Sequence, residues 1–327
     1  MMAKEGFFQQ KAWDRLVRQL ERLPHALLLH GPQGVGKLQL AERFAQLLLC
    51  EARDRRTTPC GRCDGCRWFL AGNHPDLRFI EPEAIARQTA IEDSEGTERK
   101  KNKPSTEIRI EQIRGLADFL NIGSHRGGRR VAIVHPAEAM NAHAANALLK
   151  SLEEPPAGAI FLLVSHRPSR LLATIRSRCI PSPVPLPVAS AARAWLEAQD
   201  VQEGTRRLAF AGGAPLRALE DASGWRGARA DELLRAIASR DMAALQGPKD
   251  RDALELLAEA LQKFAYDCAL ASFGLPPKYT SGAESKDASS REWLSYARKM
   301  GRDRALARHP VNALLHAGEM LAGLPQK

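Results

Sequence analysis

The sequence lacks long hydrophobic runs. Its apolar stretches, such as residues 161–164, have the length of a strand and fall far short of the ~20 residues that cross a bilayer. The N-terminal residues lack the apolar core of a signal peptide, and no repeat of fixed period is present. With 44% hydrophobic and 26% charged residues, the composition excludes disordered and collagen-like chains. We therefore expect a cytoplasmic globular protein with no membrane partner, built from two or three domains.

Cysteine is scarce, with six in 327 residues, yet four of them fall within 17 positions: Cys50, Cys60, Cys63 and Cys66. The two-residue spacers let successive sulfurs face one ion, and four thiolates form the closed tetrahedral set that Zn²⁺ prefers in structural sites. An iron–sulfur cluster is the alternative, but the ferredoxin spacing would need a cysteine at Leu70. Disulfides are disfavoured in the cytoplasm. The spacing predicts a structural zinc module at residues 50–66.

Helical and strand patterns alternate in the first half of the chain. The expected strands are 26–29, 131–134 and 160–164, and the expected helices are 37–49, 110–120, 142–152 and 171–176. Continuous apolar strands between helices indicate an α/β core with a parallel sheet covered on both faces. The polar, charged segment 83–105 predicts a mobile surface loop.

Prolines at 181, 183, 185 and 187 predict an extended linker that closes the first domain, residues 1–185. Beyond it only helical patterns occur: 189–198, 203–211, 228–239, 251–273, 290–307 and 310–322. We expect a small helical domain at 186–227 and a larger all-α domain at 228–327.

A glycine-rich loop follows the first expected strand. Residues 31–37 match the first seven positions of the phosphate-binding pattern G-x-x-x-x-G-K-[ST], and they include Gly31, Gly34, Gly36 and Lys37. Such a loop turns backbone N–H groups toward phosphates, and its lysine reaches the outer phosphates. A glycine-rich turn that arose by chance is the alternative, and the strand and helix on either side argue against it.

Two departures from the pattern affect magnesium. Leu38 has no hydroxyl at the eighth position, and strand 131–134 is followed by His135 where an acidic residue should support the metal; Glu138 has the wrong offset. Phosphoryl transfer needs Mg²⁺ to neutralise developing charge, so these losses predict a degenerate core with little hydrolysis. Bound ATP and an empty loop retained for the fold both stay open as alternatives.

Three stretches together carry a family resemblance: the phosphate loop with the four-cysteine insert after its helix, residues 145–156 (ANALLKSLEEPP) and residues 171–179 (LLATIRSRC). The chain resembles the AAA+ clamp-loader subunits of bacterial DNA polymerase III over roughly residues 20–220. Leu38 and His135 resemble its non-hydrolysing members and depart from the ATP-hydrolysing gamma/tau type. An active gamma/tau-type motor is the main alternative, and a stand-alone zinc-containing DNA-binding protein is another.

The resemblance implies an AAA+ core, a helical lid at 186–227 and a collar at 228–327 that joins five subunits. It implies gamma/tau and delta subunits, the sliding clamp and primer-template DNA as partners, within a DNA polymerase holoenzyme and without independent catalysis by this chain. The motif Ser177, Arg178 and Cys179 is implied to reach a neighbouring subunit's ATP site, with Arg178 acting in trans. An always-charged planar guanidinium suits γ-phosphate oxygens.

Two further positions concern nucleotide sensing. Ser165 lies where the family has a polar sensor residue, although a serine at a strand end is often only a cap. In the lid, active members have Gly-x-x-Arg, whereas this chain has Leu216 at the arginine position and Arg217 one place later.

The formal net charge is +10, and a strongly basic chain suggests a polyanionic partner. Residues 126–178 hold eight basic and three acidic side chains, so half of the excess lies in this segment. We therefore expect one local basic surface that faces a neighbour's nucleotide, within a surface of mixed charge.

Overall fold

The computed structural model describes residues 9–52, 57–86, 104–122, 128–245, 247–248, 250–280, 288–307 and 309–325. The chain divides into two compact units, residues 7–187 and residues 188–327. The division falls between Pro187 and Val188, inside the proline-rich stretch.

The first unit contains a five-stranded sheet in which every neighbouring pair is parallel, with the order β2-β3-β4-β1-β5. The strands are β1 (Ala26–His30), β2 (Leu77–Ile80), β3 (Arg130–Val134), β4 (Ala159–Ser165) and β5 (Ile180–Pro183). Strands β1, β3 and β4 are apolar along almost their whole length because both faces of the sheet are buried. The predicted α/β class is confirmed.

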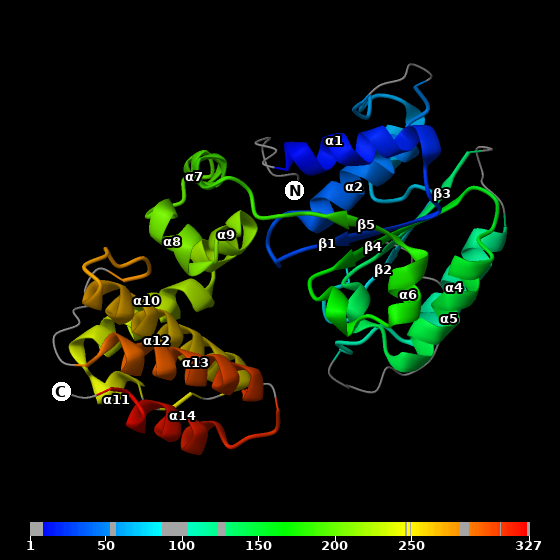
Figure 1. The fold of residues 1–327 in the computed structure, drawn as a ribbon. Coiled ribbons are helices and arrows are strands. Elements are labelled where there is room, and N and C mark those ends of the chain that lie inside the picture. Colours follow the sequence, from blue (N-terminus) through cyan, green and yellow to red (C-terminus); the bar gives the residue numbers. More distant parts are fainter. Residues whose placement is uncertain are drawn as a thin grey trace. The chain divides into compact units, whose positions relative to one another are not determined.

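Helices cover both faces of this sheet (Figure 1). On one face lie α4 (Ile110–Asn121), α5 (Ala142–Glu153) and α6 (Ala173–Arg178), which share a core cluster with Leu28. On the other face lie α1 (Gln10–Arg18) and α2 (Lys37–Leu48). Short elements complete the unit: α3 (Asp64–Leu70), η1 (Gln19–Arg22), η2 (Ala137–Ala139) and η3 (Pro168–Arg170). Successive strand residues such as Leu27 and Leu28 are both buried, because they point to opposite covered faces.

The expected linker at 181–187 is wrong in its first part, because residues up to Pro183 form β5 and pair with β1. Proline cannot donate a ladder hydrogen bond, but β5 is the edge strand, where that loss is tolerated. The sequence also left α1, α3 and β2 unpredicted. Strand β2 is four residues long and lies at the other edge, with too little pattern to distinguish it from a loop.

The described part of residues 188–327 contains helices and no strand. Its elements are α7 (Ala189–Glu197), α8 (Gly204–Phe210), α9 (Pro215–Ser223), α10 (Trp225–Ser239), α11 (Met242–Leu245), α12 (Arg251–Ser272), α13 (Ser290–Leu306) and α14 (Ala313–Ala322). Helix α12 is the centre of the core, because most of its side chains are buried against α10, α13 and α14. The predicted all-α character is confirmed for these residues.

Most of the expected mobile loop at 83–105 lies outside the described residues, since 87–103 are not among them. Within the described residues, no helix has both the length and the apolar character needed to span a membrane.

Candidate functional site

The phosphate loop lies at the carboxyl edge of the parallel sheet. Strand β1 ends at His30, which is in register with Ser165 at the end of β4. Strand β3 ends next to them, with Val134 paired to Leu163. The sheet therefore brings together the loop, His135 and Ser165, which the sequence had placed at separate strand ends.

Three glycines give this loop its shape. Gly34 and Gly36 have φ of 79° and 82°, in the left-handed region that side chains rarely adopt. Gly31 has φ of 153°, and a Cβ there would lie 2.2 Å from the carbonyl oxygen of Val184. The predicted loop residues thus form a tight turn that opens α2, with Gly31 pressed against the chain that follows β5.

Lys37 turns back onto its own loop. Its Nζ donates hydrogen bonds to the carbonyl oxygens of Gly31 at 2.8 Å and Pro32 at 2.5 Å, and its side chain is buried. Burial lowers the pKa of Lys37 to about 8, with the nearby carboxylate of Glu138 opposing the shift. The ammonium group is therefore hydrogen-bonded to the backbone of its own loop.

Glu138 has a structural task beside this lysine. Its Oε1 accepts hydrogen bonds from the backbone N–H groups of His166 at 2.9 Å and Arg167 at 3.0 Å, so it ties η2 to the end of β4.

Burial lowers the pKa of His166 to about 4, and the Lys37 charge adds to that effect, so this imidazole is neutral at pH 7. The Ser165 hydroxyl is fully buried and has no hydrogen-bond partner among the described residues.

The two magnesium-supporting positions are occupied by side chains that cannot bind the ion as a P-loop enzyme does. Leu38 is half-buried and apolar. His135 lies with its Nδ1 3.3 Å from the Glu81 Oε1, and its ring makes an edge contact with His166. Neither group supplies the hydroxyl or free carboxylate that magnesium coordination at a phosphate requires.

The Ser177–Cys179 motif closes α6. The Arg178 guanidinium is half-exposed, with Nη2 2.6 Å from Glu153 Oε1 and Nη1 donating to the Thr174 carbonyl oxygen at 2.9 Å. Exposed Ser177 donates to the same carbonyl at 3.0 Å. Cys179 is buried in the core, and burial raises the pKa of its thiol to about 12. Cys179 therefore packs the end of the motif into the core, whereas the polar groups of Ser177 and Arg178 lie at the surface.

The four cysteines of residues 50–66 come together. Their sulfur atoms all lie within 4.8 Å of one another, with Cys60 to Cys66 at 3.9 Å and Cys50 to Cys63 at 4.0 Å. Four sulfurs at about 2.3 Å from one tetrahedral ion stand about 3.8 Å apart, so these residues can hold a metal ion. The Cys268 thiol is buried in the helical unit, as expected for a core residue.

Backbone N–H groups point at the sulfur atoms of this cluster. Cys60 N–H donates to Cys50 Sγ, Cys63 N–H to Cys60 Sγ and Cys66 N–H to Cys63 Sγ, each at 3.4 Å. Backbone N–H groups lower the pKa of Cys60 to about 6, whereas burial raises those of Cys50 and Cys66. The hydrogen bonds from backbone N–H groups to sulfur favour the thiolate form that binds metal.

Close packing fixes the cysteine module on the α/β unit. A Cβ on Gly65 would lie 2.5 Å from the carbonyl oxygen of Leu49, so α3 rests directly on the end of α2. The Trp13 indole N–H donates to the Thr57 carbonyl oxygen at 3.1 Å, which ties the module to α1.

In the helical unit, Arg217 is not free to sense a nucleotide. Its Nη2 donates to both carboxylate oxygens of Glu259, at 2.9 and 2.8 Å. Glu259 is almost fully buried and also pairs with Lys263, Arg226 and Arg304. This buried ion cluster joins α9, α10, α12 and α13 and was not predicted from the sequence, because its arginines are far from Glu259 along the chain.

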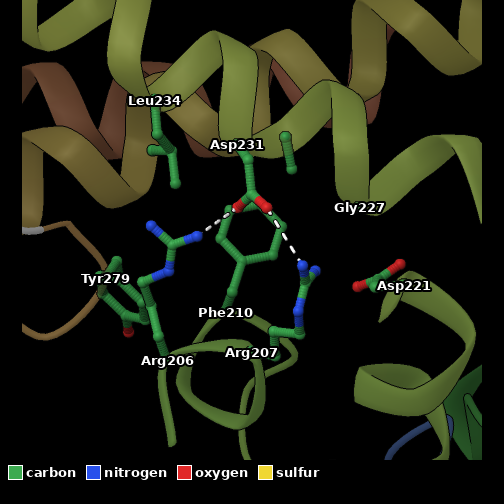
Figure 2. A pocket seen from close by; sticks show the side chains of 9 residues that line it. Arg206, Arg207, Phe210, Asp221, Gly227, Asp231, Leu234 and Tyr279 are labelled. Atoms are coloured by element: carbon green, nitrogen blue, oxygen red, sulfur yellow. Dashed lines mark hydrogen bonds and ion pairs between the residues drawn. The ribbon is translucent and has the colours of Figure 1, made fainter. Parts of the chain in front are cut away.

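A small pocket between α8 and α10 has a second ion cluster (Figure 2). Arg206 and Arg207 approach the Asp231 carboxylate from its two oxygens, at 2.8 and 3.3 Å. Both guanidinium groups among the described residues that line the pocket are paired with this carboxylate. The ion cluster therefore joins α8 to α10, and neither arginine of this lining is left unpaired for a ligand.

Comparison with known proteins supports the resemblance seen in the sequence. The family model described as "DNA polymerase III, delta subunit" matches residues 8–185, more than half of the chain. The protein named "DNA polymerase III subunit delta'" of Pseudomonas aeruginosa is 43% identical over 215 residues, 64% of this chain and 59% of that protein. Its namesake in Escherichia coli is 36% identical over 155 residues, 47% of this chain and 40% of that protein.

Other matches carry related names. "DNA polymerase III subunit tau" of Salmonella typhimurium is 37% identical over 161 residues, 49% of this chain and 22% of that protein. A solved gamma subunit-related protein of Thermotoga maritima aligns over 95% of this chain and 97% of its own, with 17% identity and a TM-score of 0.49. The chain spans about half the length of the delta-prime relatives that it matches.

Proposed function

The chain belongs to the DNA polymerase III delta-subunit family, and from that premise we propose that it is a non-hydrolysing, delta-prime-type subunit of the clamp loader. In this role it helps to place the sliding clamp on primed DNA. It supplies Arg178 in trans to the ATP site of a neighbouring subunit.

The observation that carries the proposal is the state of the phosphate loop. The Lys37 ammonium is hydrogen-bonded to two carbonyl oxygens of its own loop, and Leu38 and His135 replace the groups that support magnesium. Without that ion, charge developing on the phosphate oxygens is not neutralised. We infer that the chain does not hydrolyse ATP.

The exposed arginine supports the second half of the proposal. Arg178 is held at the end of α6 by buried residues on both sides, Ile175 and Cys179, while its guanidinium reaches the surface. An arginine presented by a rigid element can donate several hydrogen bonds to γ-phosphate oxygens of another chain.

The partners follow from the family. We propose gamma/tau-type and delta-type subunits as direct neighbours, with the sliding clamp and primer-template DNA reached through the complex. The metal at the four cysteines is proposed to be structural Zn²⁺, because four thiolates close the coordination sphere and leave no open position for substrate.

The test is the ATPase rate of a complex assembled with gamma/tau-type and delta-type subunits, clamp and primed DNA. We expect Arg178→Ala to lower kcat for ATP hydrolysis at the neighbouring site by about 10³–10⁵-fold, the contribution of an arginine supplied in trans, while assembly stays intact. Arg178→Lys should retain little of this ATPase rate, since an ammonium group lacks the planar set of N–H donors of a guanidinium. Arg176→Ala, in the same helix turn, is the matched control. Unchanged turnover in Arg178→Ala would reject the trans-acting role.

A gamma/tau-type motor is the second candidate, because relatives named subunit tau match the chain at up to 37% identity. The isolated chain distinguishes the two. A magnesium-dependent ATPase that rises with clamp and DNA and is lost in Lys37→Ala would establish the motor.

A further inference from the structure

Arg178 is held at two points that come from two different elements. Its Nη2 lies 2.6 Å from Oε1 of Glu153, the last residue of α5, and its Nη1 donates to the carbonyl oxygen of Thr174 in the first turn of α6. No other partner of the guanidinium occurs among the described residues, so its remaining N–H donors stay available.

The backbone under this arginine is rigid. Ile175 is fully buried and Cys179 is 4% exposed, both in the core cluster that α5 and α6 share. The freedom left to Arg178 is therefore in its own long side chain, which has several rotatable bonds. The contact with Glu153 restricts that freedom.

Stability does not explain the pair. The Glu153 side chain is 50% exposed and that of Arg178 is 35% exposed, and ion pairs between such exposed side chains contribute little to stability. The geometry has a different consequence: both terminal nitrogens of the guanidinium are bound on the protein, which fixes its plane and leaves Nε–H and one N–H on each terminal nitrogen as the remaining donors.

We propose that Glu153 is the positioning residue for Arg178: it holds the guanidinium in the direction from which its remaining N–H donors meet the phosphate of a neighbouring subunit's nucleotide. This inference rests on the proposed trans-acting role of Arg178. Glu153 does not touch the nucleotide, and its effect passes through the arginine.

The adjacent Glu154 provides a matched control. It is exposed and carries the same charge, and among the described residues it makes no hydrogen bond or ion pair with Arg178. Variants at both positions therefore change net charge equally, and a difference between them measures the contact itself.

The test uses the complete complex with clamp and primed DNA. At the neighbouring site, Glu153→Ala is expected to lower kcat about tenfold while KM for ATP changes little, since misplacement of a catalytic group affects the chemical step. Glu153→Gln is expected to retain most of the rate, because its amide oxygen still accepts the Nη2 hydrogen bond. Glu154→Ala should match the unmodified chain. A Glu153→Ala complex with unchanged kcat, or a rise in kcat in both Glu153 variants, would overturn the proposal.

A second measurement separates this proposal from the role of Arg178 itself. The NMR order parameter of the Arg178 Nε–H in the full chain should fall in Glu153→Ala and stay unchanged in Glu154→Ala. If Arg178→Ala leaves turnover intact, the trans-acting role fails whatever the order parameter shows. If Arg178→Ala lowers turnover but Glu153→Ala leaves the order parameter unchanged, the trans-acting role of Arg178 stands and only the positioning role of Glu153 is rejected.

Discussion

Lys37 Nζ donates a hydrogen bond of 2.8 Å to the carbonyl oxygen of Gly31, six residues earlier in the same loop. In a phosphate-binding loop the corresponding nitrogen binds the outer phosphates of the nucleotide. A nucleotide would have to take the ammonium away from this carbonyl and from that of Pro32. The loop retains the shape of a nucleotide site, with the Lys37 ammonium group beside the carbonyl oxygens of Gly31 and Pro32.

Restoring one magnesium-supporting group should not restore hydrolysis. We expect Leu38→Thr to leave the isolated chain without measurable ATPase activity, because His135 still stands where an acidic residue would support the ion. The measurement is phosphate release with saturating Mg²⁺ and ATP. An increase in turnover from Leu38→Thr alone would show that the second position is not needed.

Metal loss should disrupt the cysteine module. We expect one zinc per chain by elemental analysis, and Cys60→Ser should lose it and lower the melting temperature, since metal affinity is linked to folding of its site. Cys268→Ala, in the helical core, should keep the full zinc content. Iron with visible absorbance, or full metal content in Cys60→Ser, would contradict the assignment.

A methyl group on Gly31 should be costly. Gly31→Ala places a Cβ 2.2 Å from the Val184 carbonyl oxygen, so we expect a loss of about 1–3 kcal/mol in the free energy of unfolding. Gly115→Ala is the control: Gly115 lies on the exposed face of helix α4 with open space around it, and the substitution should stabilise by about 0.5–1 kcal/mol. Denaturant titration measures both, and equal stability of the two variants would refute the steric argument.

Glu259 should make the helical unit sensitive to acid. Burial pushes its pKa up, but Lys263, Arg217 and Arg304 outweigh burial and bring it to about 2, below the ordinary 4.5. Its contribution to stability is therefore fully present above pH 4.5 and is lost as the pH falls toward 2. We expect Glu259→Gln to cost about 3 kcal/mol at pH 7, because it leaves buried cations uncompensated.

The control for this prediction is Glu232→Gln, which removes a surface pair with Arg229 and should cost less than about 1 kcal/mol. The loss in Glu259→Gln, measured by denaturant titration, should shrink as the pH falls from 4.5 toward 2. A loss that stays constant across this range would show that the carboxylate charge is not its cause.

Much of the α/β unit follows from the sequence, because its central strands are continuous apolar runs and its helices have apolar faces. The edge strands do not follow from it. Strand β5 contains two prolines, and the sequence pattern indicated a linker; only its place beside β1 shows that it belongs to the sheet.

The sequence by itself determined the features carried by short, contiguous patterns: the glycines of the phosphate loop, the cysteine spacing, the Ser177–Cys179 motif and the missing hydroxyl at Leu38. Only the tertiary structure decided how the charged side chains are used. Arg178 meets Glu153, and Arg217 meets Glu259, 42 residues away. The physical reason is that backbone conformation depends largely on local residues, whereas the partner of a long charged side chain depends on which distant elements pack beside it.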